Sequence, residues 1–178
     1  MADSTRWQSP TCSTCFTCSL HVLYMFYQVA KLFMFAPASG LFSCPLAMTD
    51  GAAATLQMLG VEGDALNRLT SRDPKIFWTS GQWMTEPKGG SDVNGSTETV
   101  AVPDGGGGWR LHGYKWFSSA TDSDMALTLA RVVRDGRIGG LSMFYLKTRG
   151  EDGQLNGIQV QSSNSVSSTN SSISRWPR

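Results

Sequence analysis

Residues 83–93 read WMTEPKGGSDV, and the interpretation of the whole chain starts from them. A strand is expected to end at Thr85, because Pro87 has no N–H group with which to continue a hydrogen-bonded ladder. The two glycines that follow let the backbone approach a ligand without a Cβ in the way. Thr85 and Ser91 supply hydroxyls that donate and accept, and nearby N–H groups can form an anion-binding concavity. The stretch predicts a site for a ligand with a polar ring edge and a pyrophosphate; a generic tight turn is the alternative.

The segments downstream of this stretch alternate as strands do. Glycine-rich or Asp-Gly turns separate them at residues 103–108, 135–136 and 152–153. Several short strands at such spacing indicate a small antiparallel sheet, either a barrel or a sandwich. The strands are expected at residues 76–84, 98–102, 109–117, 125–133, 141–147 and 158–160.

The segments upstream have helical character. Residues 51–59 are rich in alanine, with Thr49 or Asp50 as the expected N-cap and Gly60 as the stop. Residues 63–69 are expected to add a further turn or two. Helices followed by strands give an α+β fold class.

The first 28 residues do not have the composition of the middle of the chain. Cys12, Cys15 and Cys18 follow one another at intervals of three, but Cys44 comes much later. The bacterial ferredoxin pattern places its fourth cysteine four positions after the third. We therefore expect free thiols, with a metal or iron–sulfur site as the alternative. Disulfides are not favoured without a secretory context.

Residues 22–35 are apolar enough to predict a helix that is buried against something. The longest uninterrupted apolar run, 22–27, is far below the roughly 18 residues of a membrane-spanning helix. The basic, apolar and small-residue regions of a secretory signal do not appear in order. An intracellular protein without a membrane partner is expected, and a single-pass anchor is the alternative.

The charge balance and the placing of the histidines exclude some partners and one kind of metal site. The chain has 15 basic and 14 acidic residues, for a net charge of +1. This leaves no electrostatic argument for a nucleic-acid or acidic-membrane partner. His21 and His112 lie far apart in the sequence, which excludes a local histidine-rich zinc site, and no metal is expected.

Residues 161–178 are dominated by serine and asparagine. They offer too little apolar area to offset an ordering cost of about 1–2 kcal/mol per residue for the backbone alone. We expect this tail to be disordered, with a phosphorylated tail as the functional alternative.

Three motifs occur in an order that is typical of one family. The stretch TEPKGGSD at 85–92 resembles the Thr-Glu-Pro-x-x-Gly-Ser-Asp signature of FAD-dependent acyl-CoA dehydrogenases. KWFS at 115–118 is similar to the family's second signature, and CPLAMTDGAA at 44–53 resembles the end of its N-terminal helical domain. The third match is closest to the alkylation-response (adaptive response) branch. The resemblance covers residues 29–160.

The resemblance implies an FAD cofactor and an acyl-CoA ligand. Thr85 and Ser91 would contact FAD, Trp116 would lie against the flavin ring, and the Ser118 hydroxyl would reach the ring edge near N5, with Ser119 as the substitute. Glu86 and Asp92 are expected to be structural, and Lys115 to be a solvated or phosphate-facing cation. The full set of implied cofactor contacts is Met84, Thr85, Gly90, Ser91, Trp116, Phe117, Ser118 and Ser119.

The resemblance also implies a division of the chain. We expect a cysteine-containing leader at 1–28, part of a helical domain at 29–77, a middle β-domain at 78–160 and the tail at 161–178. The family's C-terminal helical bundle, with its catalytic glutamate, is expected to be absent, so no catalytic residue is assigned. The implied function is α,β-dehydrogenation of acyl-CoA thioesters with hydride passing to the flavin; a non-catalytic FAD- or acyl-CoA-binding or regulatory fragment is the alternative. A full-length relative is expected to form a homo-oligomer.

Overall fold

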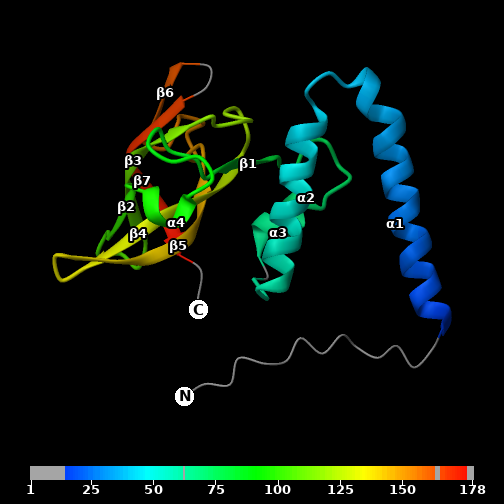
Figure 1. Cartoon of the computed structure of the whole chain (residues 1–178), viewed down its shortest axis with the longest axis horizontal. Coiled ribbons are helices and arrows are strands. Elements are labelled where there is room, and N and C mark those ends of the chain that lie inside the picture. Colours follow the sequence, from blue (N-terminus) through cyan, green and yellow to red (C-terminus); the bar gives the residue numbers. More distant parts are fainter. Residues whose placement is uncertain (1–14, 62, 163–164, 176–178) are drawn as a thin grey trace. The chain divides into compact units, whose positions relative to one another are not determined.

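The computed structural model describes residues 15–61, 63–162 and 165–175 (Figure 1). The chain divides into two compact units, residues 1–43 and 44–178, which are described separately. In the first unit, α1 (Cys15–Phe35) is followed by a 3₁₀ turn, η1 (Ala36–Ala38). The helix predicted at 22–35 is confirmed and begins earlier, at Cys15, but the burial expected for it is not observed, because the side chains of residues 22–35 are exposed. Within the described residues, no helix has the combination of length and apolar character needed to cross a membrane.

The second unit begins with two helices, α2 (Ser43–Met58) and α3 (Asp64–Leu69). The predicted end of α2 is confirmed: Gly60 has a φ of +64°, and the Val61 N–H donates to the Leu56 carbonyl at 3.0 Å. This is the hydrogen bond of a Schellman stop, which favours glycine at this position. The predicted N-cap is wrong, because Thr49 and Asp50 lie inside the helix.

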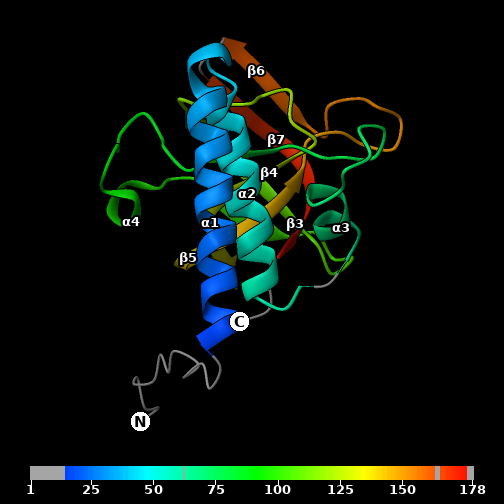
Figure 2. The same cartoon turned by 90° about the vertical axis from the view of Figure 1, so that its right-hand side faces the viewer.

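Seven strands form one curled sheet, and α4 (Val93–Ser96) lies in the loop between the first two of them (Figure 2). The strand order is β1-β4-β2-β3-β7-β5, and β6 pairs with β7. The last strand of this order, β5, also pairs with β4. This curled sheet confirms the α+β fold class. The strands are β1 (Ser80–Trp83), β2 (Val100–Pro103), β3 (Trp109–Trp116), β4 (Met125–Arg134), β5 (Arg137–Lys147), β6 (Ile158–Ser162) and β7 (Ser165–Arg175).

The pairings of β4 with β1 and with β2 are parallel, whereas the others are antiparallel. Alternation predicts a strand and its buried face but does not give the direction of its neighbours. The parallel pairs join strands that are separated by long connections, as parallel pairing requires. The expectation of a uniformly antiparallel sheet therefore holds for the hairpins and fails for these two pairs.

The backbone of the serine-rich tail differs from its expected disorder. The backbone of β7 pairs with that of β3, where Ile173 lies opposite Trp109 and Val166 opposite Lys115, and a second pairing joins β7 to β6. Apolar burial is not the only source of order, because without β7 one side of β3 would present a row of unpaired N–H and C=O groups. Residues 163–164 and 176–178 of the predicted tail, and most of the predicted leader, lie outside the described residues.

Two groups of buried apolar side chains form the core of the second unit. One fills the interior of the curled sheet and includes Trp83, Trp109, Leu111, Phe144 and Leu146. The other joins the helices to the sheet and consists of Ala52, Leu56, Leu69, Met125 and Leu127. The second group is the reason that α2 and α3 belong to the same unit as the strands.

Candidate functional site

The signature loop, which is the TEPKGGSD stretch at residues 85–92, is a folded element with its own hydrogen bonds. The Gly89 N–H donates to the Glu86 carbonyl at 3.0 Å, which closes a tight turn around Pro87 and Lys88. Asp92 caps α4, since its Oδ1 accepts from the Gly95 N–H at 2.9 Å. This is the structural role predicted for Asp92.

The two glycines of the signature have different surroundings. A Cβ added at Gly89 would overlap the Ser96 side chain, so only glycine fits there. A Cβ added at Gly90 would meet nothing within 4 Å. Gly89 is therefore required by the fold, whereas the space beside Gly90 is open to a ligand.

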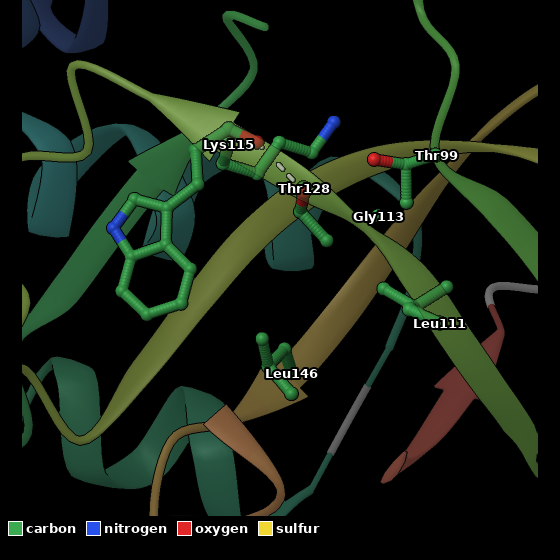
Figure 3. A pocket seen from close by; sticks show the side chains of 7 residues that line it. Thr99, Leu111, Gly113, Lys115, Thr128 and Leu146 are labelled. Carbon is green, nitrogen blue, oxygen red and sulfur yellow. Dashed lines mark hydrogen bonds between the residues drawn. The ribbon is translucent and has the colours of Figure 1, made fainter. Parts of the chain in front are cut away.

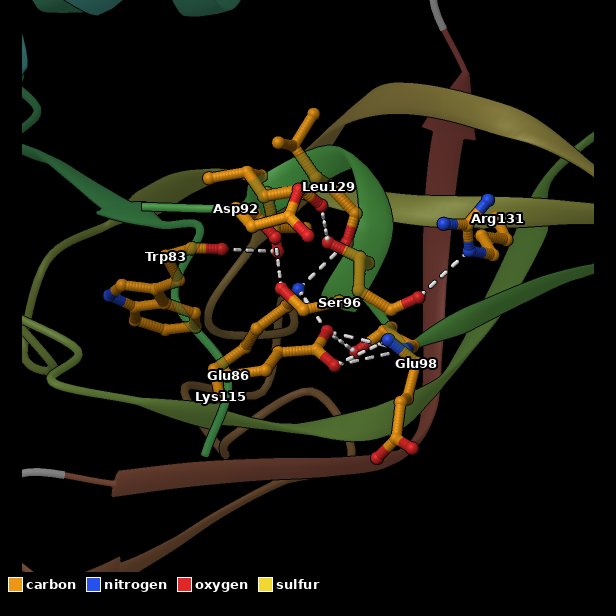
Figure 4. A network of polar contacts seen from close by, with 12 residues as sticks. Trp83, Glu86, Asp92, Ser96, Glu98, Lys115, Leu129 and Arg131 are labelled. Carbon is orange, nitrogen blue, oxygen red and sulfur yellow. Dashed lines mark hydrogen bonds and ion pairs between the residues drawn. The ribbon is translucent and has the colours of Figure 1, made fainter. Parts of the chain in front are cut away.

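Glu86 is the centre of a buried polar network (Figure 4). Its carboxylate accepts from the Glu98 N–H at 2.6 Å and from the Thr99 hydroxyl at 2.5 Å. It also accepts from Lys115 Nζ at 2.6 Å, and the same ammonium donates to the Leu129 carbonyl at 2.8 Å. The side chains of Lys115 and Glu86 are only 7% and 4% exposed.

This network confirms the structural role predicted for Glu86 and overturns the prediction for Lys115. Lys115 is neither solvated nor turned to a phosphate, because its ammonium is enclosed between Glu86 and the β4 backbone. A buried charge is tolerated only when it is paired and hydrogen-bonded. Sequence reasoning had no signal for this pair, because its members are 29 residues apart.

The electrostatics of the pair favour the ionised carboxylate. Burial by itself would raise the pKa of Glu86, but hydrogen bonds from Lys115, Thr99 and the Glu98 N–H, together with the charge of Lys115, hold that pKa below its usual value of 4.5. Burial lowers the pKa of the Lys115 ammonium, and Glu86 opposes that shift. Glu86 is therefore ionised at neutral pH and fully occupied by its donors.

Three contacts bring the two predicted flavin motifs side by side. The backbone N–H of Trp116 donates to the Thr85 carbonyl at 2.9 Å, and the indole Nε1–H of Trp83 donates to the Ser119 carbonyl at 2.9 Å. The Glu86–Lys115 ion pair is the third. The end of β1 and the end of β3 are thus fixed to each other at the backbone and at the side chains.

The predicted cofactor residues are not equally accessible. Ser118 is only 4% exposed, and no described residue hydrogen-bonds to its hydroxyl. Trp116 and Phe117 make an edge contact with ring centroids 5.4 Å apart. Met84, Thr85 and Trp116 are half-buried, and Gly90, Ser91, Phe117 and Ser119 are exposed.

A small cavity lies inside the curled sheet, beside the Lys115 side chain (Figure 3). Its volume is about 20 Å³, which has room for about one water molecule. A cofactor therefore does not bind in this cavity. The cavity is lined by Trp83, Thr99, Leu111, Gly113, Lys115, Thr128 and Leu146.

No described part of the chain gathers three or more metal-ligating side chains. Cys44, whose side chain is described, is a free thiol. Cys12 lies outside the described residues, so the Cys12-x-x-Cys15-x-x-Cys18 pattern remains a sequence-based expectation.

The chain is similar in sequence to two curated proteins that are both named as acyl-CoA dehydrogenases. Acyl-CoA dehydrogenase family member 11 of Caenorhabditis elegans is 59% identical over 145 residues, which are 75% of this chain and 24% of that protein. Putative acyl-CoA dehydrogenase AidB of Escherichia coli is 42% identical over 82 residues, which are 46% of this chain and 14% of that protein. The chain thus spans about a quarter or less of the length of these relatives.

A solved structure shares the fold as well as the sequence. The crystal structure of C. elegans ACDH-11 in complex with C11-CoA matches with a TM-score of 0.81 and 50% identity, over 85% of this chain and 29% of that one. The higher identity to the nematode protein than to AidB does not support the expected alkylation-response branch.

The family itself follows from a match that covers more than half of the chain. The sequence model of the acyl-CoA dehydrogenase middle domain matches residues 81–175, and this range includes both signature motifs and residues 161–175 of the serine-rich tail. The tail was not expected to belong to the resemblance. The chain belongs to the acyl-CoA dehydrogenase family, and residues 81–175 correspond to its middle domain.

Proposed function

We propose that this chain supplies the flavin-contacting part of an acyl-CoA dehydrogenase. The observation that carries the proposal is the joining of the two motif segments, 84–91 and 116–119, by the Trp116–Thr85 and Trp83–Ser119 hydrogen bonds. When bound, the flavin supplies the chemistry of a hydride acceptor, and the protein supplies its binding and orientation.

The residues at this junction fit such a cofactor. Open space beside Gly90 lets a phosphate or ring approach the backbone. Thr85 is half-buried and Ser91 is exposed, so their hydroxyls can donate to and accept from a ligand, and the aromatic side chains of Trp116 and Phe117 offer flat surfaces for a ring. The proposed contacts are seven of those implied by the resemblance, with Ser118 set aside because it is enclosed: Met84, Thr85, Gly90, Ser91, Trp116, Phe117 and Ser119.

Accessibility separates Ser118 from Ser119. Ser119 is exposed, so its hydroxyl can meet a bound ring without rearrangement. Ser118 is enclosed and would have to turn outward first. We therefore assign the ring-edge contact to Ser119, the residue first named as the substitute.

The proposed substrate is an acyl-CoA thioester, supported by the C11-CoA complex of the ACDH-11 structure. Glu86 is not a candidate for removing the substrate's α-proton, because its oxygens are held by four donors and its pKa is lowered. A non-catalytic FAD- or acyl-CoA-binding role is the second candidate, and it is favoured by the engagement of Glu86, an acid of the signature motif, with protein donors.

Flavin fluorescence tests the proposal directly. FAD titrated into the purified chain is expected to bind, and Gly90→Ala is expected to weaken binding by about tenfold, equivalent to about 1.4 kcal/mol. Gly106→Ala is the matched control: Gly106 lies in the turn before β3, at the opposite end of that strand from Trp116. Ser119→Ala is expected to weaken binding more than Ser118→Ala.

The same sample separates the two candidate functions. Bleaching of the bound flavin on addition of an acyl-CoA supports dehydrogenation, whereas acyl-CoA or FAD binding without bleaching supports the non-catalytic role. A chain that binds no FAD, or a Gly90→Ala variant that binds it as well as the parent, contradicts the proposed site.

A further inference from the structure

The alternation of side chains along β3 reverses where the strand ends. Trp109, Leu111 and Lys115 are buried, so an unbroken strand would bury the side chain at position 117 as well. The opposite is observed. Phe117 is 64% exposed and Ser118 is 4% exposed.

The reversal coincides with an unusual backbone conformation. Phe117 has a φ of +54°, in the left-handed region that bulky residues rarely adopt. Burial does not compensate for this conformation, because the ring is exposed and makes an edge contact with Trp116, the only aromatic contact that it has among the described residues. Residues held in such regions cluster at functional sites, where the surrounding structure fixes them.

Two hydrogen bonds hold the turn from either side. On one side the Trp116 N–H donates to the Thr85 carbonyl, and on the other the Ser119 carbonyl accepts from Trp83 Nε1–H, both at 2.9 Å. Both partners belong to the end of β1 or the residues directly after it. The signature loop thus fixes the residues on either side of Phe117.

We propose that Phe117 is a positioning residue whose left-handed conformation turns its own side chain and that of Ser119 outward together while it turns Ser118 inward. The backbone part of this inference stands on the geometry alone, and its consequence for the cofactor rests on the proposed function. An aromatic ring and a hydroxyl are thereby presented on one face, which is the pair of groups that suits a flavin ring and its polar edge.

The backbone part is tested without any ligand by a double-mutant cycle in urea. In the parent, Ser118→Ala removes a buried hydroxyl that has no partner, so the unfolding midpoint is expected to rise. Phe117→Asn tolerates the left-handed conformation, so the same rise is expected in that background. Phe117→Val is β-branched and disfavours the conformation, so in that background the rise is expected to disappear. Equal rises in all three backgrounds would overturn the inference.

The cofactor part compares two variants that both lack the ring. The Phe117→Val variant is expected to bind FAD about tenfold or more weakly than the Phe117→Asn variant, a difference of about 1.4 kcal/mol in binding free energy. Equal affinities would show that the conformation does not matter to the cofactor. If Phe117→Val does not fold, Phe117→Ala takes its place, with an intermediate loss expected. A parent chain that binds no FAD would refute the proposed function, while the urea cycle would still decide the backbone inference.

Discussion

The ion pair between Glu86 and Lys115 joins two motifs that are separated in the sequence. Both groups are nearly inaccessible to solvent, and each is hydrogen-bonded to further protein groups besides its partner. A buried pair of this kind contributes little net stability over an apolar pair, but the loss of one member leaves an uncompensated charge. Its main effect is to specify how the loop after β1 sits against the end of β3.

Lys115→Met is therefore expected to destabilise the chain by about 3–5 kcal/mol, because Glu86 would remain buried without its cation. Lys88→Met is the matched control, since Lys88 pairs with Glu98 at 2.7 Å on the surface, where both side chains are more than 60% exposed. Lys88→Met is expected to leave the urea midpoint nearly unchanged, because solvent screens this exposed pair. Urea unfolding followed by tryptophan fluorescence measures both changes, and similar losses in the two variants would refute the buried role of Lys115.

The lowered pKa of Glu86 predicts a dependence of stability on pH. Because the folded chain holds this pKa below the ordinary 4.5, the ionised carboxylate stabilises the folded state above that value. The stabilisation is lost as the pH falls through the lower, folded-state pKa. The free energy of unfolding between pH 7 and pH 3 is expected to fall more steeply for the parent than for Glu86→Gln. Parallel curves would show that Glu86 titrates as an ordinary carboxyl group.

At the scale of elements, α2 is tied to the sheet by a polar and an apolar contact. The Thr49 hydroxyl donates to the Pro45 carbonyl at 2.8 Å and accepts from the Ser80 N–H at 3.0 Å, which fixes α2 against the start of β1. Leu56, on the same helix, is 1% exposed in the cluster that includes Met125 and Leu127 of β4. Helix and sheet therefore share one core.

Leu56→Ala is expected to lower the free energy of unfolding by about 2–5 kcal/mol, through lost burial and the cavity that it leaves. Met58 lies on the same helix but is 75% exposed, so Met58→Ala is expected to change that energy by no more than about 0.5 kcal/mol. Chemical denaturation of the two variants makes the comparison. Equal effects would mean that α2 does not pack on β4 as described.

At the scale of the whole molecule, both core clusters belong to residues 44–178. Every buried member of the sheet cluster and of the helix–sheet cluster comes from this unit, and no member comes from α1 or η1. The family match, residues 81–175, also lies within this unit.

A chain that begins at residue 44 is therefore expected to keep the urea midpoint of the full chain within experimental error. A chain that begins at residue 64 lacks Ala52 and Leu56 and is expected to lose about 2 kcal/mol or more of the free energy of unfolding. Loss of cooperative unfolding on removal of residues 1–43 alone would show that the first unit contributes to the core.

The sequence by itself determined six of the seven described strands, the stop of α2 at Gly60 and the family, because alternation, turn chemistry and the signature motifs are local. It did not determine that β4 pairs in parallel with β1 and β2, or that the serine-rich tail forms the strand β7. The direction of a pairing, and whether a neighbouring strand has free N–H and C=O groups, depend on strands far away in the chain. Only the tertiary structure decided that Lys115 is buried against Glu86, that Trp83 holds the Ser119 carbonyl, and that Ser119 rather than Ser118 faces outward. The physical reason is the same in each case: a side chain's charge partner and its exposure are set by residues about 30 positions away, and by one left-handed backbone angle at Phe117 that the order of residue types does not encode.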